Sequence, residues 1–250
     1  MALGPDPDLL SGSFATDTSL VGAARCWRGN NRAQAKVQLG PQRVSQRGVS
    51  HSAGGSRSAA DSGGYMSILG IKYSCQLMLD PNTAHSRLSL SEGNRKVTWG
   101  AEQPYPDHPE RFDWWRQILC RESLTGRCYW KAEWSGDGAW IGVTYKGLGR
   151  KGDSADCGLG ANDKSWMLFC SPDSYSVRHN NKQTVLPIKS SGSRRVGVYL
   201  DRAAGTLSFY RVSSDGLTLL YSFTSSFTEP LYPGFRVYHP NSPVSLCMLG

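Results

Sequence analysis

From Ile71 onward, the chain is a series of short runs of β-branched and aromatic residues separated by Gly, Asn, Asp and Pro. Runs of this kind between turn-forming residues are typical of β-strands. They recur at spacings of roughly ten residues without a long helical pattern, which favours a sandwich or a barrel. The exception is one short helix, which we predict at 82–85, where Pro81 sits early as helices prefer. We also predict strands at 87–90, 96–99, 128–134, 140–145, 166–170, 175–179, 195–201, 206–211, 217–223, 231–236 and 244–248.

The beginning of the chain has a different composition. Gly, Ser, Ala, Arg and Gln dominate residues 1–66, and no periodic apolar pattern is present. Such a segment buries too little apolar surface to offset the entropy lost on ordering. We predict a disordered low-complexity segment over 1–70 and a single globular domain over 71–250. An alternative is that 1–66 is the product of a non-conserved or wrongly spliced exon.

Charge and hydropathy argue against a nucleic-acid partner and against a membrane span. The formal net charge is +8, but charges of both signs alternate, and no block of five basic residues occurs. Nucleic-acid binding proteins concentrate Lys and Arg in a stripe or patch, so we expect no nucleic-acid partner. No run of 18 apolar residues is present, so we expect no membrane span.

The seven cysteines form no CxxC pair, and zinc sites need closely spaced ligands, so we expect no metal and no cofactor. Cys75, Cys170 and Cys247 stand in apolar strand contexts, which predicts buried thiols. The N-terminus lacks the basic and then apolar pattern of a signal peptide, and no Asn-X-Ser/Thr acceptor occurs. These features favour a reducing compartment, and the predicted localisation is cytoplasmic.

Two patterns bear on catalysis. Residues 147–152 spell GxGxxG after a predicted strand, but a dinucleotide site needs a helix to begin there. The following residues, DSADCGLG, are poor helix formers, so we interpret the segment as a mobile basic loop. No HExxH or GxSxG motif occurs, and we predict that the protein is not an enzyme.

Three ordered blocks carry a resemblance to a known family. They are CQLMLDPNTAHSRLSLSEGNRKVTW at 75–99, GRCYWKAEW at 126–134 and VGVYLDRAAGTLSFY at 196–210. With DHPERFD at 107–113 and LYPGF at 231–235, they resemble the PRY-SPRY family. The sequences of these blocks are similar to those of domains in fish tripartite-motif proteins, NACHT–leucine-rich-repeat receptors and stonustoxin-type subunits. Three positions depart from the family pattern: Lys131 replaces a Glu, and Arg202-Ala203 replace Tyr-Glu.

The resemblance implies a two-sheet antiparallel β-sandwich, jelly-roll-like, with a short N-terminal PRY segment. It also implies a non-catalytic module that binds a protein ligand through loops on one face. Such a module would be the recognition domain of an intracellular innate-immune or ubiquitin-ligase-related protein. Residues 1–66 hold one Cys and no heptads, so we expect no RING, no coiled coil and no ligase activity from this chain alone. The alternative is a lectin-like or toxin-subunit domain that binds glycans or membrane-surface ligands.

The family's variable binding regions map onto a small set of positions in this sequence. A rival interpretation assigns two of them, Trp140 and Phe169, to the core, where we also place Trp130, Trp134 and Trp166. The predicted partner-binding residues are Trp140, Lys146, Arg150, Phe169, Ser171, Tyr238 and His239.

Overall fold

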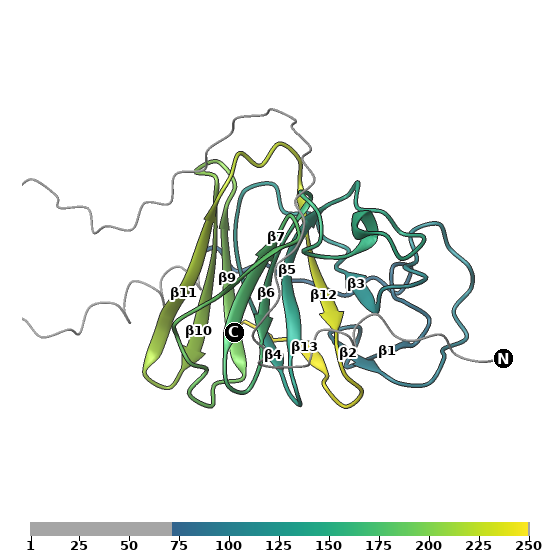
Figure 1. Ribbon diagram of the computed structural model, residues 1–250, viewed down its shortest axis with the longest axis horizontal. Coiled ribbons are helices and arrows are strands. Elements are labelled where there is room, and N and C mark those ends of the chain that lie inside the picture. Colours follow the sequence, from purple (N-terminus) through teal and green to yellow (C-terminus); the bar gives the residue numbers. More distant parts are fainter. Residues whose placement is uncertain (1–71, 250) are drawn as a thin grey trace, which may run out of the picture. The chain divides into compact units, whose positions relative to one another are not determined.

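The computed structural model describes residues 72–249, so the predicted disorder of residues 1–70 lies outside the described part (Figure 1). Within 72–249, no helix has the length and hydropathy needed to cross a bilayer. One 3-10 helix, η2 (Ala155–Cys157), is present in this range. The strands are β1 (Leu88–Ser91), β2 (Lys96–Trp99), β3 (Gln117–Leu119), β4 (Arg127–Trp134), β5 (Ala139–Tyr145), β6 (Ser165–Cys170), β7 (Tyr175–His179), β8 (Lys182–Val185), β9 (Arg195–Asp201), β10 (Thr206–Ser213), β11 (Gly216–Thr224), β12 (Leu231–Val237) and β13 (Val244–Leu246).

These strands form two antiparallel sheets, which confirms the predicted sandwich. The seven-stranded sheet has the order β1-β2-β13-β4-β9-β10-β11, and the six-stranded sheet has the order β3-β12-β5-β6-β7-β8. Figure 1 shows the strands of both sheets running in similar directions, as in an aligned sandwich.

The main core lies between the sheets and follows from the alternation of side chains along each strand. In β4, Trp130 and Trp134 point inward and are almost fully buried, while Lys131 lies on the opposite face. The Trp130 ring meets Phe235 of the other sheet edge-on, with 5.8 Å between ring centroids. Trp166 is also buried, so the assignment of these three tryptophans to the core is confirmed.

A second apolar cluster covers part of the outer face of the six-stranded sheet. Residues 146–164 fold back over this face and contribute Leu148 and Leu159. This covering is why β5 and β6 are buried on both faces over much of their length. The cluster contains Phe112, Leu119, Trp140, Leu148, Leu159 and Met167, with Phe169 and Tyr232 packed against it.

The eleven predicted strands are present with boundaries within two residues, but β3 and β8 were missed. The predicted helix at 82–85 is wrong, because the segment is a turn. The Asn82 backbone N–H donates to the Asp80 carboxylate at 3.0 Å, and the Thr83 hydroxyl donates to the Asp80 carbonyl at 2.9 Å. Such local side-chain bonds offer the backbone an alternative to the helix.

The prediction of a free thiol at Cys75 is also wrong, because Cys75 forms a disulfide with Cys128 of β4. The bond fastens a short segment to the edge of β4, where Ser74 bridges to Tyr129 in parallel. β13 occupies the same edge further along, and the Cys247 N–H donates to the Lys131 carbonyl at 2.9 Å. Cys170 is a buried free thiol as predicted, whereas Cys247 is only partly buried. Burial raises the pKa of both thiols.

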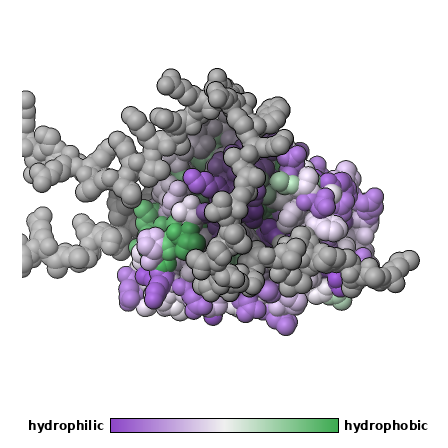
Figure 2. Space-filling view, in the orientation of Figure 1, coloured by the Kyte–Doolittle hydropathy of each residue, from purple (hydrophilic) through white to green (hydrophobic). Residues whose placement is uncertain are grey.

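The surface is not uniform. Figure 2 shows a cluster of hydrophobic residues on the side of the molecule where Figure 1 places β10 and β11. Hydrophilic residues dominate the lower rim and the right side of the same view.

Candidate functional site

Four of the predicted site residues form a continuous row of rings, which we call the aromatic row: Trp140, Phe169, Tyr238 and His239. Trp140 on β5 lies directly opposite Phe169 on β6, and their ring centroids are 4.9 Å apart. The Tyr238 ring, just beyond β12, lies 6.1 Å from Phe169 and 4.5 Å from His239. Three segments that are distant in sequence therefore meet at one end of the six-stranded sheet.

Strand alternation explains why the row is on the outer face. Ala139 and Ile141 of β5 point into the main core, so Trp140 between them points outward. Leu168 and Cys170 of β6 do the same for Phe169. Opposite aromatic residues on neighbouring strands are a favourable pairing, worth about 0.2–1 kcal/mol relative to alanine.

The turn before β5 depends on a glycine beside the row. Gly138 has φ +139°, and a Cβ there would lie 2.4 Å from the Cys170 carbonyl oxygen and 3.2 Å from the Phe169 ring. The same turn is tied to the last long loop, because the Asp137 N–H donates to Ser242 Oγ at 3.0 Å. The turn, β6 and the loop that carries Tyr238 are thus held in one arrangement.

The members of the row differ in exposure. Trp140 is only 5% exposed and belongs to the second cluster, which is largely what the rival core interpretation predicted. Phe169, Tyr238 and His239 are partly exposed. A ligand at this end would therefore contact Phe169, Tyr238 and His239, with Trp140 as the support beneath them.

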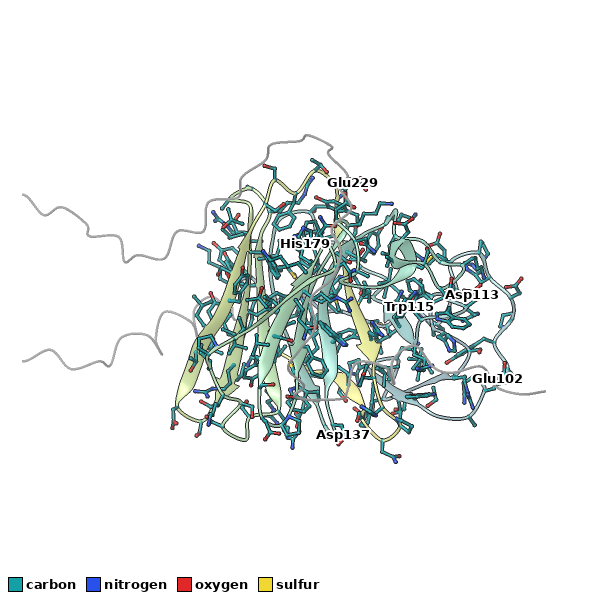
Figure 3. All side chains as sticks on the ribbon, in the orientation of Figure 1. Glu102, Asp113, Trp115, Asp137, His179 and Glu229 are labelled. Atoms are coloured by element: carbon teal, nitrogen blue, oxygen red, sulfur yellow. A yellow bond between two sulfur atoms is a disulfide. The ribbon has the colours of Figure 1, made fainter. Side chains whose placement is uncertain are left out.

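Two arginines and a tryptophan near the row were missed by the sequence reasoning. The Arg178 guanidinium carbon lies 5.9 Å from the Trp140 ring centroid. Arg236 is opposite Trp140 in the strand register, and its guanidinium carbon lies 4.4 Å from the Trp115 ring centroid. Figure 3 places Trp115 and Asp113 together beside β3. The available signal was a single Arg on the outward-facing side of a strand whose alternate positions are mostly apolar.

Ser171 lies next to the row in sequence, but its hydroxyl group is used within the β6–β7 turn. Ser171 Oγ donates to the Ser174 carbonyl at 3.0 Å, and the Ser174 N–H donates to Ser171 Oγ at 3.1 Å. The residue therefore shapes the turn.

The structure does not bring Lys146 and Arg150 to the row. They follow the far end of β5, a seven-residue strand that spans about 20 Å. Figure 3 shows the two ends of the sheet: Asp137, just before β5, lies at one end, and His179 and Glu229 lie towards the other.

Arg150 anchors its own loop instead of facing the row. It donates to Glu110 at 3.1 Å, and its guanidinium carbon lies 4.9 Å from the Phe112 ring centroid. Desolvation lowers its pKa.

Polar side chains join the loop over 146–164 to β3 and hold it together internally. Gln117 Oε1 accepts from the Leu159 N–H at 3.0 Å, and Asn162 Nδ2 donates to the Ala155 and Gly158 carbonyls at 2.8 and 2.9 Å. No helix begins at 147–152, so the structure supports no dinucleotide site there. Among the described residues, no three His, Cys, Asp or Glu side chains are grouped to hold a metal ion.

Comparison with protein families accounts for most of this part of the chain. Residues 77–124 match the SPRY-associated domain, PRY, and residues 127–248 match the SPRY domain. The chain belongs to the PRY-SPRY family. This is generally a non-catalytic interaction fold.

Relatives of this PRY-SPRY domain include toxin subunits and tripartite motif-containing proteins. Stonustoxin subunit beta from Synanceia horrida is 47% identical over 66% of this chain and 24% of its own length. Tripartite motif-containing protein 16 from Mus musculus is 39% identical over 72% of this chain and 33% of its own length. The chain thus spans a quarter to a third of these relatives.

Solved structures of both kinds share the PRY-SPRY fold. The TRIM65 PSpry domain has a TM-score of 0.66 and 28% identity, covering 73% of this chain and 96% of its own chain. The stonustoxin structure has a TM-score of 0.64 and 44% identity, covering 70% of this chain and 27% of its own.

The DHPERFD sequence of the PRY segment has a structural role in this domain. Arg111 of DHPERFD is buried, and its Nη1 donates to the Pro81 and Ala84 carbonyls at 2.8 and 2.7 Å. Its Nε and Nη2 donate to the Pro106 carbonyl. Arg111 therefore joins the LDPNTA turn to the following loop, and Phe112 beside it enters the second cluster.

Proposed function

We propose that residues 72–249 form a non-catalytic module that binds a protein ligand at the end of the six-stranded sheet that carries the aromatic row. The observation that carries the proposal is the row itself, in which four rings from three segments are held on a fixed support. Rigid aromatic side chains give large contact area at low entropic cost, which is why they dominate interface energetics.

The sheet supplies the rigidity that such a site needs. Trp140 and Phe169 lie within strands, while Tyr238 and His239 lie in a loop tied to the β4–β5 turn. Ligand-binding surfaces are commonly loops positioned by a scaffold of this kind. The Arg178 and Arg236 guanidinium groups pack over the rings of Trp140 and Trp115 and add to the fixed support of the row.

The setting is a further part of the proposal. We propose a cytoplasmic recognition domain of an innate-immune or ubiquitin-ligase-related protein, with no nucleic-acid partner and no catalytic role. The similarity to tripartite motif-containing proteins supports this setting.

A second candidate function is a toxin-subunit domain that binds glycans or membrane-surface ligands. The 47% identity with stonustoxin subunit beta supports it. So does the disulfide between Cys75 and Cys128, because disulfides persist in oxidising compartments.

The test is quantitative affinity purification from cell lysate with the full 250-residue chain as bait. Phe169→Ala and Tyr238→Ala remove rings from the row. Trp140 is left intact, because truncating a buried Trp costs about 3–5 kcal/mol and would confound binding with folding. The matched control is Tyr199→Ala, a partly exposed aromatic residue on the outer face of the other sheet. Lys146→Ala tests the far end of β5.

We expect a specific protein that is retained by the wild type, Tyr199→Ala and Lys146→Ala and lost by both row variants. Retention by the row variants, with loss in Lys146→Ala, would place the site at the far end and refute the proposal. Absence of any specific protein, with binding to a glycan array or to anionic vesicles, would establish the second candidate.

A further inference from the structure

The free edge of the seven-stranded sheet is a long strand without charge. β11 has nine residues, GLTLLYSFT, and pairs only with β10 in the described sheets. No backbone group of residues 72–249 hydrogen-bonds to its other edge. Leu219 on this strand is 49% exposed, and the hydrophobic surface in Figure 2 lies on this side of the molecule.

The other sheet edges in the described part are short or blocked. β8 has four residues and begins with Lys182, and β1 also has four residues. β3 has three residues and is covered by a bridge from Leu79 to Cys120. Proteins protect exposed edges with charges, prolines, short strands or bulges. β11 has only a bulge, at Leu220, which has no partner on β10.

The two ends of β11 carry complementary features. At its start, the β10–β11 turn presents the exposed Asp215 carboxylate. At its end, a hollow of about 540 Å³ is lined by Arg202, Gly205 and residues 224–228. Arg202 is oriented there because its guanidinium group donates to the Thr228 and Glu229 carbonyls. One end of the edge is therefore acidic, and the other is a basic hollow.

We propose that β11 pairs antiparallel with β11 of a second copy of this chain, about a two-fold axis. An antiparallel arrangement brings the Asp215 turn of each copy to the Arg202 hollow of the other, whereas a parallel one would oppose two aspartates. A surface that is complementary to itself in this way is what an isologous dimer requires.

Strand alternation selects the register of this pairing. Leu217 and Leu219 face outward with Val212 and Tyr210, and Ser222 faces outward with Ser208. Residues that lie opposite each other must share a face, and pairing Leu219 with the partner's Ser222 keeps the faces matched along the whole strand from 217 to 224. In this register the two Leu220 bulges adjoin the axis, and Asp215 lies opposite the partner's Ser226, which lines the hollow. The pairing extends over about 30 Å of strand.

The experiment is sedimentation-velocity ultracentrifugation of the full chain at concentrations up to the order of 100 µM. We expect a reversible dimer, and we expect Leu219→Lys to raise its Kd by at least about tenfold, because a lysine at an edge opposes strand addition. The matched control is Val185→Lys, on the edge strand β8, where the side chain is 70% exposed. This variant should leave the Kd unchanged.

A charge exchange tests the orientation. Asp215→Arg should weaken the dimer because it opposes the partner's Arg202, and Asp215→Arg with Arg202→Glu should restore it. A chain that stays monomeric over the whole concentration range would overturn the proposal. So would a dimer that Leu219→Lys does not weaken, or one that Val185→Lys weakens equally.

Discussion

Protonation of His85 should destabilise the domain in a defined pH range. His85 lies in the PRY turn and is only 7% exposed, and burial, aided by the charge of Arg116, lowers its pKa to about 4. The Arg87 N–H donates to His85 Nδ1 at 3.0 Å, so the native state holds the imidazole neutral, with Nδ1 as an acceptor. Protonation would remove that acceptor.

The sign and size of the change in unfolding free energy follow from the linkage between protonation and folding. The pKa of an unfolded histidine is about 6.5, so between pH 6.5 and about 4 the unfolded chain binds the proton and the native state does not. The contribution of His85 is therefore fully present above pH 6.5 and is lost as the pH falls toward 4. With these two pKa values, the free energy of unfolding falls by about 2 kcal/mol between pH 7 and pH 5.

The measurement is urea unfolding followed by tryptophan fluorescence at pH 7 and pH 5, for the wild type and His85→Asn. Asn keeps an acceptor near the Nδ1 position and does not titrate, so the variant should lose about 2 kcal/mol less than the wild type. His239→Gln, which changes a histidine outside the turn, is the control and should behave as the wild type. Equal losses in wild type and His85→Asn would refute the reasoning.

Two further substitutions should lower the free energy of unfolding by amounts that follow from the structure. Gly138→Ala should lower the free energy of unfolding by about 3 kcal/mol, since the turn needs a positive φ and a Cβ would meet the Cys170 carbonyl. Gly100→Ala, where a Cβ has nothing within 4 Å, is the control for the same denaturant titration, and a similar cost in both would contradict this account. Cys75→Ser should lower the unfolding free energy by about 4 kcal/mol under oxidising conditions, the chain-entropy value for cysteines 53 residues apart. A reductant should destabilise the wild type but not this variant, and a wild type insensitive to reductant would count against the disulfide's role.

Strand positions could be predicted where alternating side chains and flanking turn residues mark the strand in the local sequence. β2, β7 and β9 have the predicted boundaries because each carries such a pattern between Gly, Asn or Asp residues. β8 carries no such signal, because all four of its side chains are exposed and only its pairing with β7 makes it a strand. β3 is too short for any periodicity, and it is buried because Ile118 packs in the main core and Leu119 in the second cluster.

The site was partly predictable for a related reason. The resemblance located the aromatic row, but the depth of Trp140 depends on Leu148 and Leu159 folding back over it, a non-local event. Lys146 and Arg150 were grouped with the row because they follow β5 in sequence, yet the length of β5 separates them from it. The pairing of Cys75 with Cys128 likewise joins residues far apart in the chain.

The first and last segments of the described domain share one edge of β4. The segment around Ser74 and the segment after β13 meet β4 only two residues apart, at Tyr129 and Lys131. The two ends of the domain are therefore attached to β4 at nearly one point. Tension between the two ends would load the edge of β4 and the disulfide, and the aromatic row on the other sheet would stay intact until that edge gave way.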